Sequence, residues 1–280
     1  MTTCVVNITT HKRRACLASA FALAVAFAAA SAEAAVTPPK SIADKGTIVY
    51  CSDLSFPPLE YFDPKTNQPA GFEVDLATET GTFGMDEHSI QKPFLTDEVR
   101  AVLNNPKHPF NVKLNSQLKK ASDLEKEEYG LFFASAGHAA LYDYPTARGL
   151  QTVAEDVWDR GGIVAAVCHG PVILPGIIDS KTGKSIIEGK TVTGFTIEGE
   201  IVLNVFEKLK SDKVIPVVEA VSKVGANYSS PMHPFDDYSI TAGRVITGAN
   251  PASARSAAER AVKAFNGLQE AKGQKPSIAA

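Results

Sequence analysis

The sequence is poor in the residues that build metal centres and disulfide scaffolds. Only four cysteines occur in 280 residues, and they lie at positions 4, 16, 51 and 168. No two of them have the close spacing of a zinc site, and their scatter excludes the disulfide framework of a small secreted domain. We therefore expect a hydrophobic core, and neither a structural metal nor disulfides, to hold the chain together.

An excess of charge of one sign is also missing. Lysine and arginine total 28 against 31 aspartate and glutamate, so the net charge is -3, which argues against nucleic acid as a principal partner. No glycine-rich loop has the spacing of a phosphate-binding motif. The hydrophobic content of 44%, with 20 glycines and 17 prolines, is typical of a globular protein. At this length, one large α/β domain or two small ones are possible.

The N-terminus has the pattern of a secretory signal peptide. A basic stretch, Lys12-Arg13-Arg14, precedes an apolar run from Ala15 to Ala30, and two small-x-small cleavage patterns follow it. We predict a signal peptide over 1–34, and hence a periplasmic or secreted protein with no stable membrane anchor after cleavage. A linker over 35–45 would lead into the domain, and residues 272–280 are expected to form a disordered tail.

One stretch, from Gly161 to Pro171, combines a buried strand with reactive side chains. Its run of five apolar residues, 163–167, predicts a strand buried on both faces, and Cys168-His169-Gly170 ends that run abruptly. The pattern predicts a strand, a sharp turn and a following helix, with the thiol at the corner. Helix N-terminal N–H groups near the thiol would favour the thiolate, and His169 would serve as its base.

The rest of the chain alternates between strand and helix patterns. We predict strands over 46–52, 71–77, 129–136, 191–195 and 243–248, and helices over 114–124, 146–160, 200–210 and 252–268. Such alternation predicts an α/β fold with one parallel sheet covered by helices on both sides. Ligands of such sheets bind beyond the carboxyl ends of the strands. Gly137-His138 and Cys168-His169 both fall at such ends, so we expect them to share one crevice.

A cysteine nucleophile also needs an oxyanion site and a carboxylate that orients its histidine. Backbone N–H groups near Gly137 and at the turn would supply the first. Either Glu198 or Glu200, just past the strand at 191–195, would supply the second. From the residues alone both glutamates remain candidates.

Other polar clusters are weaker candidates. The stretch Asp86-Glu87-His88 could ligate a metal, but three consecutive residues rarely point to one centre, and we predict no metal site. His233 is interpreted as structural. Two further clusters, 142–145 and 236–238, are interpreted as turns or the rim of a pocket.

From Gly71 to about Lys263 the chain resembles the PfpI/ThiJ superfamily, and within it the class of glutathione-independent glyoxalase III and stress-chaperone proteins. About two-thirds of the chain matches in order. The matching segments are 79–89, 133–138, 165–171, 194–196 with 199–200, 236–241 and 247–254.

The resemblance implies a flavodoxin-like parallel sheet sandwiched by helices, with a nucleophile elbow at a strand carboxyl end. It implies a homodimer that needs no cofactor. The family's catalytic triad would fall on Cys168, His169 and Glu200, and Gly137, His138 and Gly170 would lie at the oxyanion and substrate pocket. The implied reaction converts methylglyoxal and water to D-lactate through a cysteine hemithioacetal, and related 2-oxoaldehydes to 2-hydroxy acids.

One segment departs from the family. A helix after the first strand normally carries a glutamate that touches the nucleophile, but the stretch between Ser52 and Gly71 is too short and proline-rich for it. Glu60 lies near the expected place. Residues 35–77 instead resemble the start of a periplasmic amino-acid-binding protein, so we interpret 46–271 as one PfpI/ThiJ-like domain whose part 46–70 is atypical. A fusion of the two families, or a family member with a diverged N-terminus, would explain this.

Three functions follow from these patterns. The first is a cofactor-independent glyoxalase, the second a non-catalytic holdase on the same scaffold, and the third a solute-binding protein or a fragment of one. Without its usual glutamate helix the enzyme would transfer protons more slowly.

Overall fold

The computed structural model describes residues 75–83, 97–124, 127–135 and 137–271, together with the backbone of three short strands nearer the N-terminus. Those strands are β1 (Val5–Val6), β2 (Glu60–Phe62) and β3 (Pro69–Gly71). The predicted signal peptide, the linker 35–45, the strand at 46–52 and the tail 272–280 lie outside the residues whose side chains are described.

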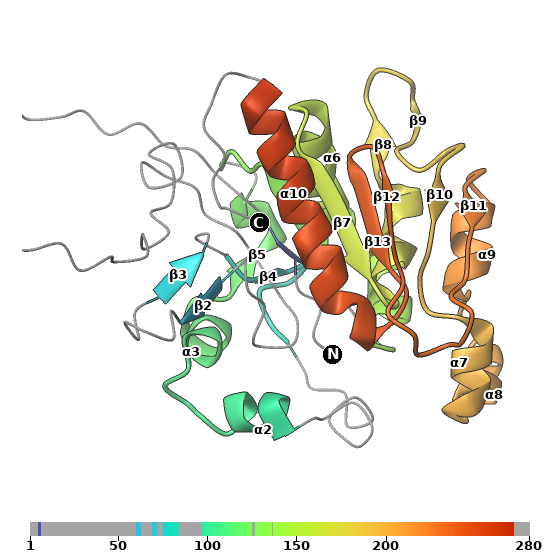
Figure 1. Ribbon diagram of the computed structural model, residues 1–280, viewed down its shortest axis with the longest axis horizontal. Coiled ribbons are helices and arrows are strands. Elements are labelled where there is room, and N and C mark those ends of the chain that lie inside the picture. The colour runs from blue at the N-terminus through green and yellow to red at the C-terminus, as the bar shows by residue number, and fades with distance from the viewer. Residues whose placement is uncertain are drawn as a thin grey trace, which may run out of the picture.

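The core of the fold is a seven-stranded sheet with the order β12-β13-β7-β6-β1-β4-β5 (Figure 1). The pairs β6–β7 and β7–β13 are parallel, which confirms the predicted parallel sheet in this part. The edge pair β4–β5 is also parallel, but β1 is antiparallel to both of its neighbours, β6 and β4. The edge strand β12 is antiparallel to β13 and was not predicted. The bounds are β4 Ala77–Thr78, β5 Lys119–Lys120, β6 Leu131–Ala134, β7 Ile163–Val167, β12 Ser239–Ala242 and β13 Val245–Gly248.

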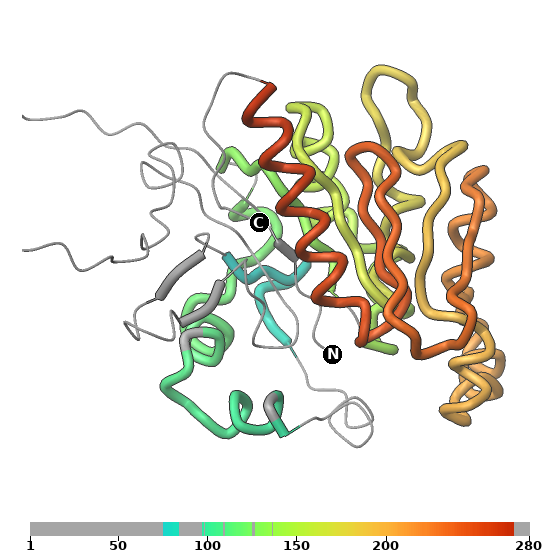
Figure 2. Tube along the Cα trace, in the orientation of Figure 1, coloured from blue at the N-terminus to red at the C-terminus, as the bar shows by residue number. Residues whose placement is uncertain are grey.

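Strand β7 is buried on both faces, as its five apolar residues predict. Ile163, Ala165 and Val167 pack into one cluster with the C-terminal helix α10 (Ala254–Ala271). Val164 and Ala166 pack into a second cluster with α6 (Arg148–Asp159). Successive side chains of a strand point to opposite faces, so the two helices cover opposite sides of the sheet. Figure 2 shows α10 running alongside the strands on its side of the sheet.

Two predicted helices are interrupted in the structure. The prediction over 114–124 is wrong. Helix α3 (Pro109–Ser116) ends at Ser116, and Gln117 is its C-cap. Strand β5 then follows as a partner of β4, and α4 (Ala121–Leu124) comes only after β5. The prediction over 200–210 joins two helices, α7 (Ile197–Val202) and α8 (Phe206–Ser211). Asn204, with a φ of 57°, takes a left-handed conformation that breaks the helix between them.

The remaining elements are short. The predicted strand at 191–195 is confirmed only as β10 (Thr191–Val192), which pairs with β11 (Asn227–Tyr228) outside the main sheet. The others are α2 Asp97–Leu103, α5 Ala140–Asp143, η1 Tyr144–Thr146, η2 Gly170–Gly176, β8 Ile178–Asp179, β9 Lys184–Ser185, α9 Val217–Ser222 and η3 Pro251–Ser253. Among the helices that the structure describes, none has both the length and the apolar character needed to cross a membrane.

Glu79 caps helix α6 from a distant part of the chain. Its two carboxylate oxygens accept hydrogen bonds from the backbone N–H groups of Gly149 and Leu150, each at 2.9 Å. Helix N-terminal N–H groups have no partner within the helix, and a carboxylate also interacts favourably with the helix dipole. The contact ties the end of β4 to the helix that leads into β7.

We expect Glu79→Ala to lower the free energy of unfolding by about 1–2 kcal/mol, because a helix cap is worth about that much. Urea denaturation of the variant measures this. The exposed Glu259 in the middle of α10 offers a matched control, for which Glu259→Ala should stay within about 0.5 kcal/mol of the wild type. Equal stability of the two variants would contradict the capping role.

Candidate active site

Strand β7 ends in a strained corner that carries the thiol. Cys168 has a φ of 59°, a conformation that non-glycine residues adopt rarely and that is found at nucleophile elbows. Its N–H donates to the carbonyl of Gly248 at 2.8 Å, and its carbonyl accepts from the N–H of Phe195 at 2.7 Å. The predicted turn is therefore confirmed, and backbone hydrogen bonds to Gly248 and Phe195 fix its position. The predicted helix after it is present as η2, which has the tighter 3-10 geometry.

Two glycines let the elbow approach the end of the neighbouring strand β6. A Cβ atom on Gly170 would lie 2.5 Å from the carbonyl oxygen of Ala134 and 2.7 Å from that of Ser135. Gly137, just past the same strand, has a φ of 129°, which is accessible to glycine and rare in other residues. Close contact between the two strand ends therefore depends on Gly170, and the backbone conformation just past β6 depends on Gly137.

We expect Gly170→Ala to destabilise the protein by about 1–3 kcal/mol or more, because the added methyl group meets backbone atoms that cannot rotate away. Gly267 supplies a control of opposite sign. It lies in α10 with open space around its Cβ position, so Gly267→Ala should stabilise the protein by about 0.5–1 kcal/mol. Thermal and urea unfolding measure both. A neutral effect of Gly170→Ala would show that the two strand ends separate at little cost.

Cys168, His169 and Glu200 form a continuous hydrogen-bonded chain. The sulfur of Cys168 lies 3.3 Å from Nδ1 of His169. On the other side of the imidazole, Nε2 lies 2.8 Å from Oε1 of Glu200. The two ring nitrogens therefore have different partners, and an ionised carboxylate can only accept, so Nε2 carries the proton and Nδ1 is left to accept one from the thiol.

Glu200 reaches the site from helix α7. The side chain of Thr196 accepts a hydrogen bond from the N–H of Gly199 at 2.9 Å and so fixes the start of this helix. Glu200 is 2% exposed, whereas Glu198, the alternative that the sequence left open, is exposed. The structure therefore places Glu200 beside His169 and leaves Glu198 at the surface.

The carboxyl group of Glu200 is ionised despite its burial. Burial raises its pKa, but hydrogen bonds from His138 and His169 and the electrostatic interaction with these rings outweigh that effect and lower the pKa to about 2. The site therefore contains a permanent negative charge at neutral pH, enclosed by two imidazole rings.

The thiol of Cys168 behaves differently from the sequence-based expectation of a stabilised thiolate. Burial raises its pKa strongly, and the negative charge of Glu200 raises it further. Backbone N–H groups of His169 and Gly137 donate toward the sulfur and lower the pKa, but they do not compensate for burial. The resting site is therefore a neutral thiol hydrogen-bonded to His169, which corrects the expectation that the turn alone would produce a thiolate.

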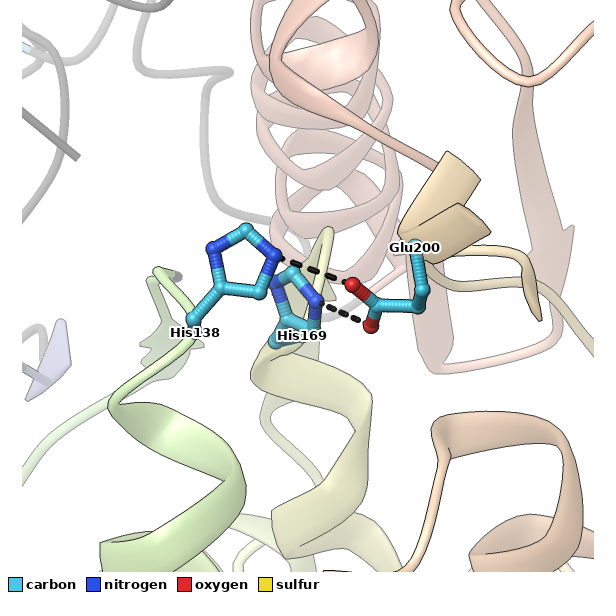
Figure 3. A group of neighbouring side chains, drawn as sticks. All are labelled: His138, His169 and Glu200. Carbon is cyan, nitrogen blue, oxygen red and sulfur yellow. Dashed lines mark hydrogen bonds and ion pairs between the residues drawn. The ribbon is translucent and has the colours of Figure 1, made fainter. Parts of the chain in front are cut away.

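His138 is the second partner of Glu200. Its Nε2 lies 2.9 Å from Oε2, so each oxygen of the carboxylate faces a different histidine (Figure 3). The two imidazole rings lie 4.4 Å apart between centroids, and the ring of Phe195 lies 4.6 Å from that of His169. The predicted meeting of Gly137-His138 with Cys168-His169 is thus confirmed by the structure.

The chain that carries this site is similar to curated proteins from two yeasts. Glutathione-independent glyoxalase HSP31 of Saccharomyces cerevisiae is 48% identical over 200 residues, which cover 71% of this chain and 84% of the relative. Glyoxalase 3 of Candida albicans is 46% identical over 208 residues, which cover 74% of this chain and 86% of the relative. No protein-family model matches the chain. The chain belongs to the glutathione-independent glyoxalases of the PfpI/ThiJ family.

A solved structure of the same glyoxalase family agrees with the fold. The crystal structure of glyoxalase III from Candida albicans matches with a TM-score of 0.66 at 47% identity, and the match covers 70% of this chain and 81% of that chain. The α/β fold with a largely parallel sheet flanked by helices, predicted from the resemblance, is therefore confirmed. None of these comparisons bears on the predicted likeness of 35–77 to a binding protein.

Of the other residues that the sequence singles out, some lie outside the described residues and some lie away from the site. Glu60 is the first residue of β2, and its side chain lies outside the described residues, as does the stretch Asp86-Glu87-His88. Asp236 accepts from the backbone N–H of His233 in an exposed turn, which fits the structural interpretation of that segment. Tyr142 donates to Asp212 at the surface and does not reach the site.

Within the part of the chain that the structure describes, one group of side chains could hold a metal ion, and it is the site itself. His138, His169 and Glu200 offer ligand atoms within 4.8 Å of one another. Two imidazole nitrogens and a carboxylate are a ligand set that suits zinc. The same atoms already satisfy one another as hydrogen-bond donors and acceptors, so the group is complete without an ion.

Proposed function

We propose that this protein is a cofactor-independent glyoxalase III, which converts methylglyoxal and water to D-lactate and acts on related 2-oxoaldehydes. The observation that carries the proposal is the hydrogen-bonded chain from Cys168 through His169 to Glu200 at the end of β7. The protein is also 48% identical to a relative named as a glutathione-independent glyoxalase and 46% identical to one named glyoxalase 3.

The first step is attack of the thiol on the aldehyde carbon. Nδ1 of His169 takes the proton as the sulfur of Cys168 bonds to that carbon, which overcomes the high pKa of the buried thiol. The carbonyl oxygen takes up the proton that His169 received from the thiol and becomes the hydroxyl group of a hemithioacetal. Backbone N–H groups of Gly137 and His169, which point toward the sulfur, lie where they can stabilise the developing negative charge.

The second step moves a hydrogen between the two carbons of the substrate. A base removes the proton from the former aldehyde carbon to give an enediol, and a proton returns to the neighbouring carbon, which leaves a thioester of lactate. His169 would relay these protons while Glu200 holds its ring. Water then cleaves the thioester, so that lactate leaves and the thiol is restored.

The test is an assay of the purified protein with methylglyoxal in the absence of glutathione and in the presence of a metal chelator. We expect loss of the aldehyde to match formation of D-lactate in a stereospecific lactate assay. Equal amounts of D- and L-lactate, or aldehyde loss without lactate, would overturn the proposal. A protein that forms no lactate but suppresses aggregation of an unfolded client would instead be the non-catalytic holdase.

We also propose that the chain is exported, on the evidence of its basic and apolar N-terminal pattern. N-terminal sequencing of the protein purified from its own cells tests this proposal, because cleavage after the small-x-small patterns would remove about 34 residues. These include β1 (Val5–Val6), so the sheet of the cleaved protein would lack that strand. An N-terminus at Met1 would contradict the proposal. The homodimer that the family resemblance implies stays a prediction, which light scattering can test.

A further inference from the structure

The carboxylate of Glu200 forms hydrogen bonds with two histidines that come from different parts of the chain. His169 follows β7, and His138 follows β6, 62 residues before Glu200. Because the carboxylate is ionised, it accepts from both, and Nε2 of each ring carries a proton. Both oxygens of the carboxylate therefore have a donor, although Glu200 is almost completely buried.

A single hydrogen bond would leave this carboxylate poorly oriented. Glutamate has several rotatable bonds, and a carboxylate held at one oxygen can still rotate about its own axis. The second donor at 2.9 Å fixes the plane of the group, and the contact of the two imidazole rings at 4.4 Å limits their movement. The direction of the hydrogen bond to His169 then follows from the position of His138.

We propose that His138 is a positioning residue: its Nε2–H holds the carboxylate of Glu200 in the orientation that keeps Nδ1 of His169 directed at the sulfur of Cys168. The effect that we expect of this role on kcat rests on the proposed function. The role replaces the sequence-based placement of His138 in the oxyanion and substrate pocket. Partners that orient a ligand or a base from outside the reacting atoms commonly contribute 10- to 100-fold.

Two variants of His138 with amide side chains distinguish the contribution of its N–H donor from that of the imidazole ring. In His138→Gln the side-chain nitrogen reaches about as far from the backbone as Nε2 does, so it can still donate to Glu200. In His138→Asn the nitrogen lies about where Nδ1 was and is too short to reach it. We expect His138→Asn to lower kcat for methylglyoxal about 10- to 100-fold with KM changed less than threefold. His138→Gln should keep at least ten times the kcat of His138→Asn.

The reactivity of the thiol gives a second measurement that does not depend on turnover. Alkylation of Cys168 by iodoacetamide, followed at that residue by peptide mass spectrometry, requires transfer of the thiol proton to His169. We expect His138→Asn to slow this alkylation at least fivefold and His138→Gln to stay within twofold of the wild type. If the wild type forms no lactate, the proposed function fails, and the alkylation rates still decide the role of His138.

The other outcomes overturn the role proposed for His138. A rise in KM with kcat unchanged would place His138 against the substrate. An equal loss of kcat in both variants, with unfolding temperatures near that of the wild type, would mean that the imidazole itself and not its donor is needed. Wild-type kcat and alkylation in His138→Asn would show that Glu200 is oriented without it.

Discussion

Replacing Cys168 by serine should reduce the turnover of methylglyoxal by about 10⁴-fold or more, because loss of a catalytic nucleophile has effects of that size. The substitution changes one atom, and the hydroxyl group can occupy the same place beside Nδ1 of His169. A hydroxyl group gives up its proton far less readily than a thiol and is a weaker nucleophile. The elbow should remain folded, since serine makes the same backbone contacts with Gly248 and Phe195.

The measurement is kcat/KM from D-lactate formation, with an unfolding curve to show that the variant is folded. Cys51→Ser is the matched control, since it makes the same chemical change at a cysteine outside the catalytic chain, and it should keep wild-type activity. Residual activity within tenfold of the wild type in Cys168→Ser would show that the sulfur does not bond to the substrate.

Glu200→Gln should lower kcat by about 10³- to 10⁴-fold while leaving the fold intact, as removal of the orienting carboxylate does in serine-protease triads. A neutral amide does not enforce the proton on Nε2 of His169, so the ring can present an N–H and not a lone pair to Cys168. It also removes the negative charge that stabilises the imidazolium formed during attack. The exposed Glu198 offers the control, and Glu198→Gln should stay within twofold of the wild type.

The same substitution should change how stability depends on pH. The pKa of Glu200 falls from its ordinary 4.5 to about 2 in the folded protein. A carboxyl group whose pKa is depressed by folding stabilises the native state above its unfolded pKa, and this contribution is lost as pH falls through the folded pKa. For Glu200 it amounts to about 3 kcal/mol at most, lost between pH 4.5 and pH 2.

Urea unfolding at several pH values in that window should therefore give a flatter curve for Glu200→Gln than for the wild type. Parallel curves would mean that the buried carboxyl group has the same pKa in the folded and unfolded protein. The two histidines would then not act on its charge as the geometry indicates.

Local sequence patterns predict the central strands and the elbow well. The apolar runs that became β6 and β7, the spacing of valines in α6 and the alanine-rich pattern of α10 each depend on neighbouring residues alone. Cys168-His169-Gly170 follows such a run directly, so the position of the thiol at a strand end could be derived before the structure.

Features that depend on distant parts of the chain could not be predicted. Strand β5 exists because β4 pairs with it, and this pairing interrupts what looks like one helix in the sequence. The contact between His138 and Glu200 joins residues 62 positions apart, and no local pattern indicates it. The raised pKa of the thiol has the same kind of origin, since burial by the folded chain outweighs the nearby backbone donors that the local sequence indicates.

The strand that ends in Cys168 divides its side chains between two cores, one under α10 and one under α6. Substitutions in the two cores that lie far apart, with no common neighbour, should have additive costs in stability. Their effects on catalysis are not independent, because a substitution in either core can displace Cys168 at the end of the strand that both cores support. Pairs of mild core substitutions, one from each layer, are therefore expected to be independent in unfolding experiments and strongly epistatic in activity. A library of such pairs would map the tolerance of the catalytic geometry separately from that of the fold.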